Sequence, residues 1–270
     1  MNTLYKFFNN IYHYRYLIFQ MTKREISQRY RGSALGIVWS FLIPLLMLIV
    51  YTFVFSVVFK ARWGDQSVEE NQINFAITLF SGLIVFNLFA DLVSRAPTLI
   101  LGNVNYVKKV IFPLEILPLV SLGVVLFHSF INLLVLLVVQ IIYKGYIPVT
   151  ALYLPLILLP LLLAGLGASW FLASLTVYIR DVAIATGVFI SILLYMSAVF
   201  FPISVLPEDF QRLIRLNPLA VVIEESRNAL IFGVPPKISE LSVLFLLGIG
   251  IAISGLLWFQ KTRKGFADVL

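Results

Sequence analysis

Six long and nearly uncharged stretches of apolar residues are the feature that most constrains how this 270-residue chain folds. Crossing a bilayer as an α-helix takes about 20 apolar residues, and each stretch is at least that long. Only 12% of the residues are charged, about half of the usual proportion in soluble domains. A backbone inside a bilayer must satisfy its own hydrogen bonds, and continuous apolar runs do so as helices. The runs cover residues 34–59, 73–94, 114–143, 151–178, 182–201 and 241–260.

The distribution of lysine and arginine predicts the orientation of these spans. If the N-terminus is cytoplasmic, the inside segments carry 13 of the 20 basic residues, and the short outside loops carry few. We therefore predict an all-α integral membrane protein with six transmembrane helices. Its 34–260 region is the membrane domain, and both termini, including the tail 261–270, are expected in the cytoplasm.

Residues 1–33 form a basic segment that precedes the first span. On a helix, Tyr16, Phe19 and Tyr30 fall on one face and most basic residues lie opposite, which is typical of an interfacial helix. Gly32 is suited to end this helix, and Ser33 is suited to cap the next one. The alternative is a plain orientation signal.

The segment 204–236, between the fifth and sixth spans, is too short and too charged to cross the bilayer. Pro207 and the acids after it predict one helix start, and Asn217 followed by proline predicts another. Glu224 and Arg227 are spaced to pair on the second helix. We expect two short re-entrant helices here, and an ordinary surface hairpin is the alternative.

The segment NVNYVKKVIFPLEILPL, residues 103–119, lies between the second and third spans on the predicted cytoplasmic side. It joins a short helical run and two lysines to prolines, which prevent the helix from continuing into the next span. A stiff, basic element of this kind suits a permease that receives force from a soluble partner. A smaller element, residues 179–183, joins the fourth and fifth spans on the same side.

Several classes of function are disfavoured by what the sequence lacks. No lysine follows a glycine, so the phosphate-binding P-loop is absent and ATP hydrolysis by that route is excluded. With no cysteine and only two histidines, His13 and His128, a metal site is not expected. The spans contain neither the acid or histidine clusters of a membrane enzyme nor the ionisable pairs and inverted repeat of an ion-coupled transporter.

Polar and aromatic residues within the spans are candidates for lining a passage. Asp91 lies one turn after Asn87, and His128 and Asn132 share a face of the third span with Ser121. Contacts between helices explain these polar residues as well as a substrate role does. Aromatic rings suit the apolar faces of sugars, although membrane helices also use them as anchors. The candidate lining residues are Trp39, Tyr51, Phe55, Phe59, Phe86, Phe89 and Tyr195.

The runs RYRGSALGIVWSFLIPLL, NVNYVKKVIFPLEILPL, YIRDV and LNPL together resemble the membrane subunit of ABC polysaccharide exporters. The resemblance covers nearly the whole chain, and it is strongest to permeases for O-antigen and related lipid-linked polysaccharides. Such permeases are homodimers that carry two separate cytoplasmic ATPase subunits, which bind ATP and Mg²⁺. The resemblance thus implies a chain that is not itself an enzyme, resides in the bacterial inner membrane and does not bind nucleic acid.

The resemblance also assigns expected roles to residues. The interfacial helix resembles a gate helix that meets the ATPase and the undecaprenyl-linked glycan, with Lys23, Arg24, Arg29, Tyr30 and Arg31. The region near 98–110 resembles a coupling helix, and the short outer helices resemble a periplasmic gate. Expected coupling residues are Asn103, Val104, Asn105, Tyr106, Val107, Lys108, Lys109, Arg180 and Asp181, and expected gate residues are Phe210, Arg212, Arg215, Asn217, Glu224 and Arg227.

The function implied is ATP-driven movement of lipid-linked polysaccharide, with O-antigen as the first expectation. Alternatives within ABC exporters are a permease for teichoic acid, for capsule, or for a small lipid or drug.

Overall fold

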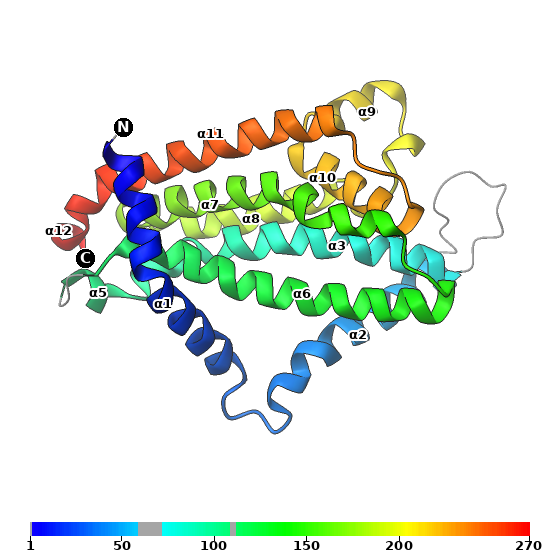
Figure 1. Cartoon of the computed structure of the whole chain (residues 1–270), viewed down its shortest axis with the longest axis horizontal. Helices are drawn as coiled ribbons and strands as arrows, with labels where there is room; N and C mark the ends of the chain where they lie inside the picture. The colour runs from blue at the N-terminus through cyan, green and yellow to red at the C-terminus, as the bar shows by residue number, and fades with distance from the viewer. Residues whose placement is uncertain (1, 59–71, 109–111) are drawn as a thin grey trace.

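The computed structural model describes residues 2–58, 72–108 and 112–270, and the regular secondary structure of these residues is all helical. The predicted all-α membrane fold is confirmed (Figure 1). The helices are α1 (Asn2–Tyr30), α2 (Trp39–Tyr51), α3 (Gln72–Arg95), α4 (Thr98–Leu101), α5 (Val104–Lys108), α6 (Leu117–Lys144), α7 (Leu154–Tyr178), α8 (Val182–Met196), α9 (Glu208–Arg215), α10 (Pro218–Arg227), α11 (Ile238–Thr262) and α12 (Phe266–Val269).

Five segments of the described chain are long and apolar enough to cross a membrane. The sixth expected span, 182–201, is the shorter helix α8, which ends at Met196. α2 continues into a π-helical segment, Thr52–Val58, and the rest of the first predicted span lies outside the described residues. The five segments are Gly36–Phe55, Asn74–Arg95, Leu114–Lys144, Val149–Tyr178 and Ile238–Val269.

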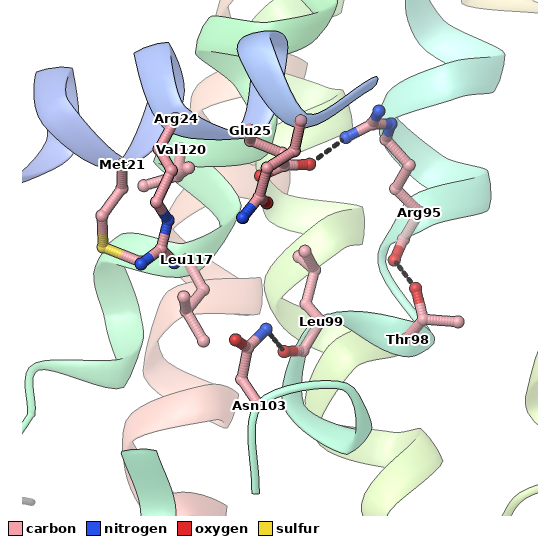
Figure 2. A pocket seen from close by; sticks show the side chains of 10 residues that line it. Met21, Arg24, Glu25, Arg95, Thr98, Leu99, Asn103, Leu117 and Val120 are labelled. Atoms are coloured by element: carbon pink, nitrogen blue, oxygen red, sulfur yellow. Dashed lines mark hydrogen bonds and ion pairs between the residues drawn. The ribbon is translucent and has the colours of Figure 1, made fainter. Parts of the chain in front are cut away.

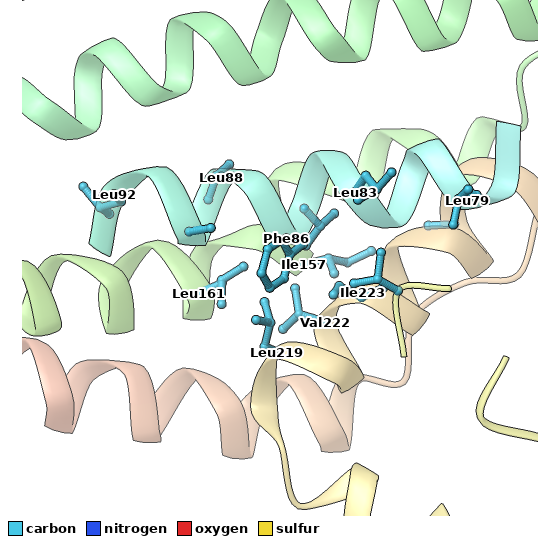
Figure 3. Packing of buried hydrophobic residues seen from close by; sticks show 14 of the residues in the cluster. Leu79, Leu83, Phe86, Leu88, Leu92, Ile157, Leu161, Leu219, Val222 and Ile223 are labelled. Carbon is cyan, nitrogen blue, oxygen red and sulfur yellow. The ribbon is translucent and has the colours of Figure 1, made fainter. Parts of the chain in front are cut away.

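Helix α3 is the centre of the bundle. Leu83 and Phe86 of α3 pack against Leu161 of α7 and against Leu219 and Val222 of α10, and all five are buried (Figure 3). Burial of α10 among the spans explains why its apolar residues occur on more than one face. α9, by contrast, has no buried residue and lies at one end of the molecule (Figure 1). Of the two short helices expected to dip into the protein, only α10 is buried there.

Helices α7 and α11 pack so closely that their backbones touch. Gly167 of α7 faces the carbonyl of Ile251, and Gly255 of α11 faces the carbonyl of Gly167. About two helical turns before Gly255 on α11, Gly248 faces the carbonyl of Pro160 of α7. Glycine permits this approach because a side chain at any of the three would collide with a main-chain atom, and small residues drive close packing between membrane helices.

The turn between α1 and α2 depends on two glycines. Gly32 has φ of +85° and Gly36 has φ of +52°, values that glycine adopts without strain. The prediction that α1 ends at Gly32 is confirmed, since the helix stops at Tyr30. The prediction for Ser33 was wrong. Leu35 precedes the next helical segment, and Ser33 contributes its backbone carbonyl to a turn by accepting a bond from Gly36.

Both termini lie at the same end of the bundle, together with α5 and α12, and α9 lies at the opposite end (Figure 1). At the shared end, Phe266 of α12 is fully buried against Phe259 of α11, and Tyr106 and Val107 of α5 pack against the same cluster. The C-terminal helix therefore packs close to the segment expected to couple to a soluble partner.

Candidate functional site

A polar cavity of about 420 Å³ lies between α1 and the elements that follow α3 (Figure 2). Its walls come from Met21, Arg24, Glu25 and Gln28 of α1, from Arg95 at the end of α3, from Thr98, Leu99 and Asn103 beyond it, and from Leu117 and Val120 of α6. The cavity therefore separates the predicted gate helix from the predicted coupling segment.

Two side-chain contacts span this cavity. Arg95 Nη1 lies 2.5 Å from Glu25 Oε1, and Arg24 Nη2 donates to the Tyr106 hydroxyl at 3.1 Å. Tyr106 in turn stacks on Phe112, with ring centroids 4.5 Å apart. Consecutive residues of α1 thus contact two different elements, because Arg24 bonds Tyr106 of α5 and Glu25 pairs with Arg95 at the end of α3.

Helix α1 does not pack as a single apolar stripe. Tyr16 and Phe19 are exposed, whereas Tyr30, predicted on the same face, has its hydroxyl 3.3 Å from Nδ1 of His128. Thr22 donates to the carbonyl of Val120, so α1 contacts α6 near Val120 as well as at His128. Thr22 and Tyr30 are eight residues apart on α1, and their partners Val120 and His128 are eight residues apart on α6, which is about 12 Å along each helix.

Helix α3 carries a polar stripe that contrasts with its surroundings. Over its residues 74–95, the exposed positions are Asn87, Asp91 and Ser94, and the positions between them are buried or half-buried. Steps of four and three residues place the three on one helix face. An exposed polar face on the central, otherwise apolar helix is costly against lipid and is expected where a helix borders water.

Aromatic side chains from α2, α3 and the end of α8 form a second cluster. The Phe55 ring lies 5.8 Å from Phe200 and 6.0 Å from Phe75, and Tyr51 lies 6.4 Å from Phe55. Tyr195 lies 5.8 Å from Phe200 and is two-thirds exposed. The outward faces of α2 and α8 are themselves apolar and exposed, as at Ile49 and Val188.

A buried carboxylate, Glu115, joins four elements at the end that holds both termini. Its side chain is 4% exposed, and its Oε2 lies 2.6 Å from Nη1 of Arg263. Asn10 of α1 donates to its Oε1 at 3.5 Å, and Trp170 of α7 donates to its backbone carbonyl at 3.0 Å. Glu115 therefore fixes the start of α6 to α1, α7 and the end of α11.

The α9–α10 hairpin is built as the sequence predicts at its two helix starts. α9 begins directly after Pro207, and the Asn217 side chain caps α10 by accepting from the Leu219 amide at 3.0 Å. Arg227, at the end of α10, is buried and donates to main-chain carbonyls. Burial raises the pKa of Glu225, which accepts a bond from the Lys237 amide.

A family assignment follows from comparison with known proteins. Residues 16–231 match the family described as ABC-2 type transporter, and this stretch contains α2 to α10, the cavity and most of α1. The chain belongs to the ABC-2 type transporter family.

Several relatives align with almost the whole of this ABC-2 chain. It is 26% identical over 256 residues to an O-antigen export system permease protein, RfbA, of Klebsiella pneumoniae, covering 94% of this chain and 95% of the relative. It is 25% identical to the protein of the same name from Myxococcus xanthus, over 96% of each chain. A polysialic acid transport protein, KpsM, of Escherichia coli is 26% identical over 89% of this chain and 91% of its own.

The predicted gate and coupling residues of the ABC-2 chain are only partly brought together. Arg24 contacts Tyr106, while Lys23, Arg29 and Arg31 are exposed. Asn103 bonds the carbonyl of Leu99 and so closes the turn before α5. Lys109 lies outside the described residues. Val104, Asn105, Val107 and Lys108 belong to α5, and Arg180 and Asp181 form the exposed turn between α7 and α8.

The predicted lining residues have different surroundings. Trp39 and Tyr195 are exposed, and Tyr51, Phe55 and Phe89 are partly buried. Phe86 is 3% exposed and belongs to the core, so it faces no open space in this chain. Phe59 lies outside the described residues.

The predicted outer-gate residues divide between the two short helices. Phe210, Arg212 and Arg215 are exposed on α9. Glu224 is half-buried on α10, while Asn217 and Arg227 are bonded to main-chain groups.

Several residues that the structure places at these sites are not among the predicted site residues. At the end of the bundle that holds both termini, Glu25 pairs with Arg95 and Glu115 pairs with Arg263. The members of each pair are 70 or more positions apart in the sequence. Phe200, whose ring lies next to Phe55 and Tyr195, is not in the predicted lining set. Among the described residues, no group of three or more histidines and acids is placed to hold a metal ion.

Proposed function

We propose that this chain is the membrane subunit of an ATP-driven exporter that moves lipid-linked polysaccharide, with O-antigen as the cargo, across the bacterial inner membrane. Two copies would form the passage and two separate ATPase subunits would bind ATP and Mg²⁺. The near full-length similarity to proteins named O-antigen export system permease supports this assignment.

One geometric observation carries the proposal of a polar cargo. The central helix α3 is exposed only at Asn87, Asp91 and Ser94 over its residues 74–95. A permease for apolar lipids or drugs has no need of an exposed polar face in the middle of its bundle. A hydroxyl-rich polymer needs such a face, because each sugar hydroxyl loses water on entry and requires a replacement partner.

Coupling to the ATPase would occur at the end of the bundle that holds both termini, which we assign to the cytoplasm. There, the exposed 179–181 turn and the exposed positions Asn105 and Lys108 of α5 are available to a soluble partner. Displacement of α5 would reach α1 through the Arg24–Tyr106 contact, and the Glu25–Arg95 pair would carry it to α3. The glycan would enter beside α1, the gate helix.

The exposed apolar faces of α2 and α8 suit contact with a second copy. The described part of the chain has five candidate spans and one shorter apolar helix, which are too few to surround a polymer. Pairing of α2 and α8 across a two-fold axis would place the Tyr51, Phe55 and Tyr195 rings beside the passage, with the α9–α10 hairpin at its periplasmic mouth.

Capsular polysaccharide is the second candidate cargo, because a polysialic acid transport protein also aligns with most of the chain. The decisive experiment deletes the gene and measures glycan at the cell surface and lipid-linked glycan in the membrane. We expect surface O-antigen to be lost and undecaprenyl-linked polymer to accumulate. Loss of capsule alone would favour the second candidate, and unchanged glycans would overturn both.

The exposed stripe of α3 leads to a prediction that needs no knowledge of the cargo. Because the chain has no cysteine, single cysteines are specific reporters in the native background. We expect Asp91→Cys and Ser94→Cys to react with a membrane-impermeant charged thiol reagent, since both positions would border water. Leu92→Cys is the matched control, because Leu92 is fully buried on the same helix. If all three cysteines were equally protected from the reagent, α3 would not line a water-filled passage.

A further inference from the structure

Helix α8 ends inside the thickness of the bundle. Its 15 residues extend about 22 Å, less than the roughly 30 Å of a bilayer's hydrocarbon core. The carbonyls at its end have no continuing helix to bond them, and carbonyls without a donor are strongly disfavoured in such surroundings. Donors must therefore come from side chains of other elements.

Those donors belong to the α9–α10 hairpin. Asn217 Nδ2 donates to the Met196 carbonyl at 3.2 Å and to the Ser197 hydroxyl at 3.0 Å. Arg227 donates through Nη1 to the Ala198 carbonyl at 2.8 Å and through Nη2 to the Val199 carbonyl at 2.5 Å. The side chains that start and end α10 thus bond four consecutive residues, the last residue of α8 and the three that follow it.

Arg227 also ties this segment to the central helix. Its Nε donates to the carbonyl of Thr78 on α3 at 3.2 Å, and the residue is 3% exposed. A guanidinium suits this arrangement because its planar fork offers several donors in fixed directions. Ala198 has φ of +51°, a conformation that costs a non-glycine residue energy unless its surroundings impose it. The two bonds from Arg227 are made to the carbonyl of this residue and to that of the next one.

The bonded segment leads directly into the aromatic cluster. Phe200 follows Val199, and its ring lies 5.8 Å from the Phe55 ring at an angle of 25°. Phe55 belongs to the π-helical continuation of α2. Any shift of residues 198 and 199 therefore moves Phe200 relative to Phe55, across the junction of α2 and α8.

We propose that Arg227 is a positioning residue for export: it fixes the chain after α8 to α3 and so sets Phe200 against Phe55 at the junction of α2 and α8. The role in export rests on the proposed function. The positional role of Arg227 stands on the contacts alone.

A glycine on α3 makes room for the guanidinium. A side chain at Gly82 would occupy the position of the Arg227 Nη2 atom. Gly82→Ala therefore displaces Arg227 without removing it, and it supplies a second variant whose helix propensity favours folding.

The test measures the distance between residues 55 and 200 directly. A Phe55→Cys, Phe200→Cys chain is treated with a short bifunctional thiol reagent in membranes, with Arg227 present or replaced by glutamine. We expect Arg227→Gln to reduce the cross-linking rate about tenfold. The loss of a donor to a buried carbonyl costs about the free energy that corresponds to a tenfold change in an equilibrium constant. Gly82→Ala should reduce the rate in the same direction, and Arg227→Lys should give an intermediate value, because an ammonium lacks the planar fork.

A control pair at the other end of the bundle separates this effect from general unfolding. Tyr178 and Phe266 have ring centroids 6.1 Å apart, and Tyr178→Cys, Phe266→Cys should cross-link equally with and without Arg227. An unchanged 55–200 rate in both Arg227→Gln and Gly82→Ala would overturn the proposal. Loss of both cross-links would also overturn it, because Arg227 would then be a general stability residue.

Export is measured separately, as surface polysaccharide in cells that carry cysteine-free Arg227→Gln. We expect export to fall about tenfold while the protein level is unchanged. Normal export with a lost 55–200 cross-link would overturn the role in export and leave the positional role standing. If the unsubstituted chain exports no polysaccharide, the proposed function fails, and the cross-linking result still decides the position of Phe200.

Discussion

Gly255→Ala is expected to cause the largest loss of stability of any single methyl group added to this protein. The new Cβ would overlap the carbonyl of Gly167, a main-chain atom that cannot move unless α7 and α11 separate. Overpacking of a well-packed core costs about 1–3 kcal/mol, and a contact with backbone lies at the upper end of that range or beyond it. The measurement is the thermal midpoint of the purified protein in detergent.

Gly250→Ala is the matched control for this substitution. Gly250 lies on the same helix, and a Cβ there meets nothing within 4 Å. Alanine at an open helical position is favoured over glycine by up to about 1 kcal/mol, so Gly250→Ala should be neutral or slightly stabilising. If the two variants melted at the same temperature, the close approach of α7 and α11 would be contradicted.

Arg263→Met is expected to destabilise the end of the bundle that holds both termini. It leaves the Glu115 carboxylate, which is 4% exposed, without the guanidinium 2.6 Å away. Removing one partner of a buried ion pair costs about 3–5 kcal/mol, because the remaining charge is left uncompensated. The partial exposure of Arg263 places the expected loss at the lower end of this range.

Two further variants isolate the effect of the pair. Glu115→Gln with Arg263→Met removes both charges, and the double variant should be more stable than Arg263→Met alone. Lys264→Met removes the same charge one residue further on and should have little effect. A double variant that is no better than Arg263→Met would show that the ion pair does not account for the loss.

Local sequence signals predicted the elements well. Continuous apolar runs gave the four longest spans, Gly32 gave the end of α1, and Asn217 before a proline gave the cap of α10. Each of these depends on residues within one or two helical turns. The prediction that Ser33 caps the next helix was wrong, because the turn at Gly36 places Leu35 before the next helical segment.

The contacts that join these elements could not be predicted from local patterns. Arg227 was expected to interact with Glu224 one turn away, and the structure shows it bonding carbonyls 28, 29 and 149 positions away. The pairing of Glu115 with Arg263 spans 148 positions. Phe86 shares its chemistry with Phe89, yet Phe86 is buried in the core and Phe89 is only partly buried. Such distinctions depend on the tertiary arrangement.

The short length of α8 has a consequence for the surrounding lipid. α6 has 28 residues and presents a hydrophobic length of about 42 Å, whereas α8 presents about 22 Å. A bilayer next to a hydrophobic surface shorter than its own core adjusts by thinning. We therefore expect the bilayer to be thinner beside α8 than beside α6 wherever α8 faces lipid.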